Sequence, residues 1–380
     1  MRTVSAVIFH RPWGDSKGEK LVRSCRQAAV RDLVESLRQI GLRPHIVLPN
    51  ADRDASWLQD LEVDVARSNG DGPFHFGEAL KEFIRSTGAD GVLYFGSGSG
   101  FLLERELLEA LRAFAQRDEP SAVLNNFYSC DFAAVARAEA LLDITLPEID
   151  NPLGFALADA GIPCSALSRS AETQFDLDTP TDVFILRASE RGGSAIRSSL
   201  DALSHDHHPI DEIQQVMTDR TAHLCFAGRV NPRTWADIES RIACRTSGLI
   251  EGRGLRSQRT PHPPVARQVL LESGPVAFFE RIARAYDGAI VDTRPFLADG
   301  GLLPTPDVRF SSDLLLPDLV ADAAWKTFTE AAIEAPIPIL LGGHSTVSGG
   351  LYLLAESCWK GRDLLRRLHP EPFDPDKERP

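Results

Sequence analysis

Short apolar runs alternate with amphipathic stretches along the whole chain. Residues 4–9 and 91–95 are two such runs, and each leads into a polar loop and then into a stretch with helical spacing. Because strands that alternate with helices usually form a parallel sheet, the pattern predicts an α/β fold in which these two runs are neighbouring central strands. Further strands are expected at 44–48 and 122–124, and helices at 27–40, 76–84, 104–116 and 154–160.

The second half of the chain has its own α/β rhythm. At 380 residues the chain is longer than one typical hydrophobic core. We therefore predict two α/β domains: a larger one with a mostly parallel sheet over residues 1–195, a linker over 196–214, and a smaller Rossmann-like three-layer domain over 215–380. In the second half, strands are expected at 222–227, 246–250, 288–291 and 337–341, and helices at 233–243, 275–286, 318–335 and 351–359.

The composition narrows the class of protein. Apolar residues make up 43% of the chain and charged residues 25%, as in soluble globular proteins. The net charge of −13 argues against a nucleic-acid partner, which requires a basic face. No apolar run is long enough to span a membrane, and the start of the chain shows no secretory signal. The six cysteines form no Cys-x-x-Cys pair, which indicates reduced thiols and a cytoplasmic protein; an oligomer stays possible.

One segment near the middle of the chain, Phe-Asp-Leu-Asp-Thr-Pro-Thr-Asp, carries the strongest candidate chemistry. Asp176 and Asp178 alternate with apolar residues, so their side chains point the same way if the segment is extended. Thr179, Pro180 and Asp182 then have the spacing of a helix start. Paired carboxylates at a strand-to-helix corner suit magnesium and a triphosphate, because hard cations prefer oxygen ligands. An ordinary N-cap after an edge strand is the alternative.

Polar residues also gather after the other expected strands of the first half. Glycine-rich loops and lysines can offer N–H groups and positive charge to an anion, and polar residues at strand ends usually face the ligand. The alternatives are a plain βα loop for the glycines and ordinary turn chemistry for Asn and Asp. The candidates for contacts with a phosphate, an acceptor or a metal are Lys17, Lys20, Gly96, Ser97, Gly98, Asn126, Asp131, Asp150 and Asn151.

The Asp-Leu-Asp-Thr-Pro-Thr-Asp segment resembles the Asp-x-Asp-Thr-Pro-Glu-Asp-Leu element of small nucleotidyltransferases of the nucleotide-diphosphosugar-transferase (GT-A) fold, such as the 2-phospholactate and molybdenum-cofactor guanylyltransferases. The resemblance extends over residues 1–190. It implies a GT-A, Rossmann-like first domain that binds a nucleoside triphosphate, with magnesium on Asp176 and Asp178. It also implies that the loop with Lys17 and Lys20 holds phosphates. Where the family has a metal-binding aspartate after a glycine, this chain has Ser97.

Two functions therefore stay open for the first domain. The first is transfer of a nucleotidyl group from a nucleoside triphosphate to a small phosphorylated or sugar-like acceptor, with Asp176 and Asp178 as catalytic, magnesium-binding residues. The second is a catalytically degenerate nucleotide- or sugar-binding module, fused to a second domain with a separate anion-binding or regulatory role. The doubled acid favours the first function, and Ser97 favours the second.

In the second half, three expected strands end in polar loops that carry Arg229, Asp292 with Arg294, and His344 with Ser345. Because parallel strands end at one edge of their sheet, these residues are expected to share a pocket. Two guanidiniums and a glycine-flanked helix start favour an anion, and Asp292 and His344 could act as an acid/base pair. The alternative is that the glycines serve tight turns and the arginines pair with acids.

Overall fold

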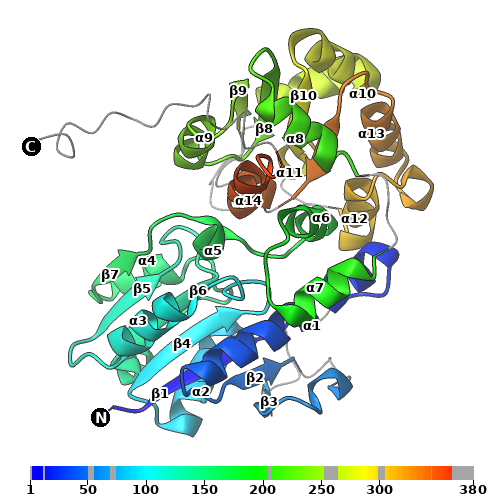
Figure 1. Cartoon of the computed structure of the whole chain (residues 1–380). Coiled ribbons are helices and arrows are strands. Elements are labelled where there is room, and N and C mark those ends of the chain that lie inside the picture. Colours follow the sequence, from blue (N-terminus) through cyan, green and yellow to red (C-terminus); the bar gives the residue numbers. More distant parts are fainter. Residues whose placement is uncertain are drawn as a thin grey trace, which may run out of the picture.

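The computed structural model describes residues 2–11, 13–49, 55–68, 74–203, 208–251, 264–297, 304–343 and 345–361. Two sheets form the framework, and helices cover both faces of each (Figure 1). We call the seven-stranded sheet with its helices the first unit, and the four-stranded sheet with its helices the second unit. The predicted α/β class with two sheets is confirmed.

The first sheet is parallel except for one strand. Its order is β3-β2-β1-β4-β6-β5-β7, and β6 runs antiparallel to β4 and β5. The two strands predicted to be central neighbours are β1 and β4, which pair in parallel from Val4↔Gly91 to Phe9↔Gly96. Because β6 is antiparallel, it begins at the edge where β1, β4 and β5 end. The bounds are β1 (Val4–Phe9), β2 (His45–Leu48), β3 (Asp64–Arg67), β4 (Gly91–Gly96), β5 (Ser121–Leu124), β6 (Phe132–Ala136) and β7 (Cys164–Ala166).

Alternating side chains along these strands bury both faces of the first sheet. Ile8 and Leu93 point into the cluster formed with α1 and α3, whereas Val7 and Val92 belong to the cluster formed with α2 and α4. Near-continuous apolar runs such as β4 are expected for strands buried on both faces. The helices are α1 (Lys17–Gln39), α2 (Phe76–Thr87), α3 (Arg105–Ala115) and α4 (Leu153–Asp159).

The start of α1 differs from the prediction. The sequence suggested a loop through Lys20 and a helix from about residue 27, but the helix begins at Lys17. Ser16 caps it, and Glu19 completes a capping box with Ser16, which fixes the first turn. Lys17 and Lys20 therefore lie on the exposed side of a helix rather than on a phosphate-binding loop.

The segment with the paired acids also differs in part. A short helix, α5 (Ala171–Gln174), precedes it, and the acids lie in an extended connection rather than at the end of a strand. The predicted helix start is confirmed, because α6 (Pro180–Ser189) begins after Thr179 with Pro180 in its first turn. Asp182 accepts hydrogen bonds from the backbone N–H groups of Asp178 and Thr179 at 2.8 and 2.6 Å, which fixes the corner.

The second unit has three layers, as predicted. Its sheet has the order β11-β10-β8-β9 and is entirely parallel over the described residues. Cys225, Ala289 and Leu341 pack with α10 and α13, and their chain neighbours Phe226 and Ile290 pack on the other face with α8 and α14. The strands are β8 (His223–Gly228), β9 (Arg245–Ile250), β10 (Gly288–Asp292) and β11 (Ile339–Gly342). The helices are α8 (Ile210–Thr218), α9 (Pro232–Glu239), α10 (Val265–Ala285), α11 (Thr293–Leu297), α12 (Pro306–Asp313), α13 (Ala323–Ile333) and α14 (Gly349–Ser357).

Two helices join the units. α6 packs against both α14 and β11, and it lies between the two sheets in Figure 1. The Thr181 hydroxyl of α6 donates a hydrogen bond of 2.7 Å to the carbonyl oxygen of Leu341 in β11. One hydrophobic cluster therefore runs from the helices of the first sheet to those of the second.

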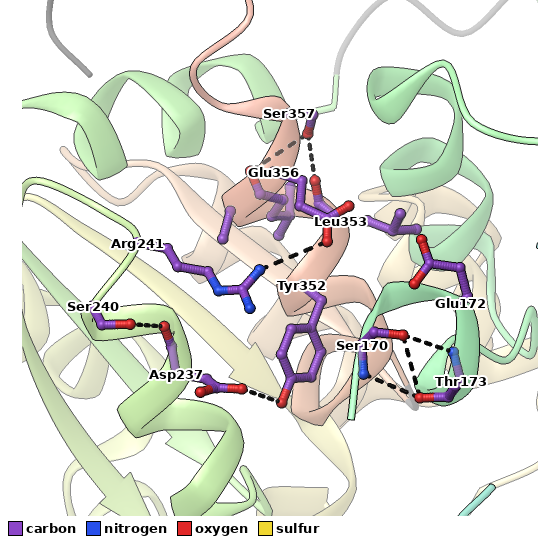
Figure 2. A network of polar contacts seen from close by, with 12 residues as sticks. Ser170, Glu172, Thr173, Asp237, Ser240, Arg241, Tyr352, Leu353, Glu356 and Ser357 are labelled. Carbon is purple, nitrogen blue, oxygen red and sulfur yellow. Dashed lines mark hydrogen bonds and ion pairs between the residues drawn. The ribbon is translucent and has the colours of Figure 1, made fainter. Parts of the chain in front are cut away.

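A polar network reinforces the same junction (Figure 2). Tyr352 of α14 donates its hydroxyl hydrogen to Asp237 of α9 at 3.0 Å. Glu356, one turn further along α14, forms ion pairs with Arg241 at 3.8 Å and with Arg191 at 3.5 Å. Arg191 in turn pairs with Glu172 of α5. α14 is thus tied to both units by charge as well as by apolar contact.

Between the units, the expected linker over 196–214 carries most of α7 (Ser194–Asp201) and the start of α8. α7 packs on α1, where Asp32 accepts hydrogen bonds from the N–H groups of Ala195 and Ile196, both at 3.0 Å. The predicted domain boundaries stay a prediction. All six cysteines are free thiols, and no helix among the described residues has both the length and the apolar character needed to cross a membrane.

The hydrogen bond across the junction can be tested with Thr181→Val, which keeps the shape and removes the hydroxyl. The buried Leu341 carbonyl would lose this donor, so we expect the free energy of unfolding to fall by about 1–3 kcal/mol in urea denaturation. Thr327→Val is the matched control, because its hydroxyl bonds Ala323 on the exposed side of α13. An equal effect of both substitutions would show that the junction bond contributes nothing of its own.

Candidate functional site

Polar side chains collect at the edge of the first sheet where its parallel strands end. His10 follows β1, Ser97 follows β4 and Asn125 follows β5, while Asp131 directly precedes the antiparallel β6. Ligands of open α/β sheets bind at this edge. The N–H of Ser97 donates to the carbonyl oxygen of Phe9 at 3.1 Å, which joins the first two of these loops.

The paired acids of the Asp-x-Asp segment reach this edge and meet an arginine. Asp178 Oδ1 lies 2.9 Å from Nη1 of Arg26, and Asp176 Oδ1 lies 3.7 Å from Nη2 of the same guanidinium. The side chains of both acids therefore point the same way, as their alternation predicts. The positive charge that they face is that of Arg26 on α1. Asp176 is buried, whereas the side chain of Asp178 is 32% exposed and can be reached from solvent.

Two further carboxyls lie close enough to interact electrostatically with this pair. Asp131 accepts a hydrogen bond from Nδ2 of Asn125 at 2.8 Å, and Asp150 accepts one from the hydroxyl of Tyr94. We call Asp131, Asp150, Asp176 and Asp178, together with Arg26, the acid site. Arg26 pairs with Asp176 and Asp178, and its charge also acts on Asp131.

The crowding of acids changes their protonation. Burial, and then the charge of Asp150, raises the pKa of Asp131 to about 7. Burial, and then the charge of Asp178, raises the pKa of Asp176 well above its usual range, and burial raises the pKa of Asp150 as well. Burial and the charge of Arg26 lower the pKa of His10 to about 3, so this imidazole is neutral. At neutral pH the acid site therefore contains carboxyls that retain protons and carboxylates that accept hydrogen bonds.

Several predicted residues lie at this edge in structural roles. The N–H of Gly96 donates to the carbonyl oxygen of Asp131 at 2.8 Å, and the carbonyl of Gly98 accepts the N–H of Leu177 at 2.9 Å. These bonds attach the glycine loop after β4 to the acid-bearing segment. Asn126 instead accepts the N–H of Tyr128 at 3.1 Å, which is turn chemistry. Lys17 and Lys20 are exposed on α1 and do not take part in these contacts.

Sequence reasoning missed Arg26, although the sequence contained a signal for it. Arg26 lies four residues after Val22 and four before Val30, both of which are buried on α1. A charged residue on the apolar stripe of a helix must be paired, because an isolated buried charge is strongly disfavoured. The arginine therefore indicated buried acids elsewhere in the chain.

The side chains present do not fit a magnesium ion as arranged. A hard cation needs several free oxygen ligands. One carboxylate oxygen of Asp176 and one of Asp178 already lie against the guanidinium of Arg26. Ser97, at the end of β4, offers a hydroxyl rather than a carboxylate. Among the described residues, no group of three or more His, Cys, Asp or Glu side chains is placed to hold a metal ion.

At the edge of the second sheet, the structure brings Arg229, Asp292 and Arg294 together. Nε of Arg229 lies 2.7 Å from one carboxylate oxygen of Asp292, and Nε of Arg294 lies 2.9 Å from the other. Burial raises the pKa of Asp292, while the Arg229 charge opposes that rise. Gly228 adopts a φ of +115°, and a Cβ there would lie 2.6 Å from Cβ of Asp292, so the close approach requires glycine. His344 and the side chain of Ser345 lie outside the described residues.

A buried acid near this cluster was also missed. Asp313, at the end of α12, is 2% exposed, and its Oδ1 has no hydrogen-bond partner in the described part of the chain. Burial raises its pKa to about 8, and the nearby charges of Asp182 and Asp292 act in the same direction. Residues 309–313 form the end of helix α12.

The Asp313 carboxyl makes stability depend on pH. The folded protein holds this proton up to about pH 8, whereas the unfolded chain loses it near the ordinary value of 3.8, so stability falls as pH rises between the two. Asp313→Asn has the shape of the protonated acid, and we expect it to raise the melting temperature at about pH 9 far more than at about pH 5. Asp318→Asn, on the exposed side of the same region, is the control. A stabilisation that does not change with pH would contradict the buried, protonated acid.

The chain was compared with protein-family models, with curated proteins and with solved structures, and only the solved structures gave matches. No protein-family model matches it, and no curated protein matches its sequence. A nucleotidyl transferase from Methanothermobacter thermautotroptrophicus is 17% identical with a TM-score of 0.36, and the match covers 46% of this chain and 91% of that one. A cytidylyltransferase from Leptospira borgpetersenii is 12% identical with a TM-score of 0.37, covering 55% and 100%. CMP:2-keto-3-deoxy-manno-octonic acid synthetase complexed with CTP is 14% identical with a TM-score of 0.33, covering 49% and 97%. These proteins are of the kind that the sequence resembles, and at such low similarity the function has to rest on the side chains of this chain.

Proposed function

We propose that the first unit is a binding module for a sugar or a nucleotide sugar, and that it does not carry out magnesium-dependent nucleotidyl transfer. The observation that carries this proposal is the acid site, in which Arg26 pairs with Asp176 and Asp178 and the charge of Asp150 acts on the nearby Asp131. The site lies at the sheet edge where α/β folds bind small molecules.

The chemistry of the acid site favours hydroxyl groups over a triphosphate. Carboxylates accept hydrogen bonds from hydroxyls, and protonated carboxyls such as Asp131 near neutral pH can also donate one. A triphosphate carries several negative charges, and like charges within about 4–6 Å repel strongly in a partly buried site. The one arginine there is already paired with Asp176 and Asp178. A hydroxyl-rich ligand with few charges is therefore the better match.

A catalytically active nucleotidyltransferase is the second candidate function. The carboxyls of the acid site are the observation that favours it. An excess of carboxyls attracts cations, so a metal–triphosphate complex could enter if Arg26 moved away. The product that distinguishes the candidates is pyrophosphate, which a nucleotidyltransferase releases from a nucleoside triphosphate.

Isothermal titration calorimetry with UDP-glucose, GDP-mannose, CTP and GTP separates these functions. We expect a nucleotide sugar to bind whether or not magnesium is present, and Asp150→Asn to weaken its binding about tenfold by removing a charged acceptor. Asp60→Asn, at an exposed acid that pairs with Arg31 of α1, is the control and should leave binding unchanged. Release of pyrophosphate from CTP or GTP with magnesium would refute the binding-module proposal.

For the second unit we propose a separate site for a small anion such as phosphate or a carboxylate. Arg294 is held by Asp292 through Nε, while its buried Nη2 has no hydrogen-bond partner within the described ranges. Buried guanidinium donors are rarely left unsatisfied, and an oxyanion matches their geometry. Arg229, with a side chain that is 25% exposed, would supply the second charge.

Inorganic phosphate tests the anion site directly. We expect phosphate to raise the melting temperature of the wild type, and Arg294→Gln to lose most of that rise because the paired donors are gone. Arg245→Gln removes an exposed guanidinium whose Nη2 donates to the backbone carbonyl of Thr221, and it should keep the rise. A phosphate-induced shift that survives in Arg294→Gln would remove this residue from the site.

A further inference from the structure

Arg26 carries a positive charge at a buried position in the first unit. It lies on the apolar face of α1 and is 6% exposed. Removing a guanidinium from water is unfavourable unless neighbouring groups compensate. Its two carboxylate partners and the ring of Trp13, whose centroid lies 5.4 Å from Cζ, provide that compensation. The arginine is thus part of the architecture of the acid site and not a surface residue that happens to reach it.

The loop after β4 lies close to this guanidinium at Gly98. A Cβ on Gly98 would lie 2.3 Å from Oδ1 of Asp176 and 2.6 Å from Nη2 of Arg26. Any side chain at position 98 would therefore collide with the ion pair. A carboxylate side chain at position 98 could not be accommodated while the guanidinium of Arg26 is in its present place. The buried arginine therefore requires glycine at position 98.

Two buried polar atoms, one on Arg26 and one in the loop after β4, lack a hydrogen-bond partner among the described residues. Nε of Arg26 and Oγ of Ser97, a residue that is 2% exposed, form no hydrogen bond with any described residue. Ser97 is adjacent in the chain to Gly98, which touches Arg26. Native proteins seldom leave such donors unsatisfied, and an oxygen atom of a ligand would satisfy them.

We infer that Arg26 is the resident cation of the acid site and occupies the place that a divalent metal ion would take between Asp176 and Asp178. This inference rests on the proposed function and deepens it, because it states which cation of the acid site binds the ligand in place of a metal. The guanidinium brings one charge and five fixed donors where a metal would bring two charges. The ligand class is therefore a sugar or nucleotide sugar whose oxygen atoms accept from Arg26 and Ser97, bound with no requirement for magnesium.

The experiment measures Mn²⁺ binding to the full chain by electron paramagnetic resonance. In the double variant Arg26→Ser/Gly98→Asp, the guanidinium is removed and a third carboxylate is placed beside Asp176, whose carboxyl has to shift because a Cβ at position 98 would lie 2.3 Å from its Oδ1. We expect wild type to show no Mn²⁺ binding that depends on Asp178, and the double variant to bind Mn²⁺ at least about tenfold more tightly. Adding Asp178→Asn to the double variant should abolish that gain. Gly88→Asp is the control, because it adds a carboxylate at an exposed glycine with no neighbouring atom within 4 Å.

Two results would overturn the inference. One is Mn²⁺ binding by wild type that Asp178→Asn removes, since the guanidinium would then yield to a metal. The other is a double variant that is folded by circular dichroism but gains no Mn²⁺ affinity. If the double variant does not fold, Arg26→Ser alone decides, with a gain supporting the inference and no gain contradicting it. Failure of UDP-glucose and GDP-mannose to bind wild type would count against the proposed function and would leave the Mn²⁺ result unchanged.

Discussion

The ion pairs of Arg26 with Asp176 and Asp178 are the interaction on which the first unit depends. They join α1 to a segment 152 residues away and neutralise charge that the surrounding core could not otherwise hold. A side chain at position 98 would collide with the Asp176–Arg26 pair, and the charge of Arg26 adds to burial in lowering the pKa of His10. The same pairing decides what the sheet edge can bind, because it takes up the carboxylate oxygens that a metal would need.

The acid-bearing segment also connects the site to the second unit. Directly after Asp178, the chain enters α6, where Thr181 bonds the end of β11. A Cβ on Gly343, just past β11, would lie 2.5 Å from Cγ2 of Thr179, so the corner of the first unit is packed against a strand end of the second. Because these contacts are close-packed and begin one residue after the acid site, a ligand that moved Asp178 would press on the edge of the second sheet.

The sequence predicted the parts of this structure that depend on local pattern. The apolar runs of β1 and β4 identified the central strands, and the shared direction of Asp176 and Asp178 followed from strand-like alternation. The start of α1 was missed because the glycines and lysines near residue 17 suggested a loop, while the capping box of Ser16 and Glu19 starts a helix there. The strand ends that carry Arg229 and Asp292 come together because a parallel sheet aligns them.

What could not be predicted depends on contacts between distant parts of the chain. The partner of the paired acids lies on a helix near the other end of the first unit, and nothing near residue 176 indicates it. The buried Asp313 lies on α12, which packs against α1, where Phe310 meets Gly18, and that contact has no local signature. A charged residue on an apolar helical stripe is the signal that such partners exist, but it does not say where they are.

The most direct measurement of the central claim is a crystal structure of the full chain grown with Mn²⁺ and GDP-mannose, with anomalous diffraction recorded to locate manganese. The account predicts that the Arg26 guanidinium lies between Asp176 and Asp178, that ligand oxygens reach Arg26 and Ser97, and that no anomalous peak appears at these carboxylates. An anomalous peak bound by Asp176 and Asp178, with Arg26 turned away, would contradict it.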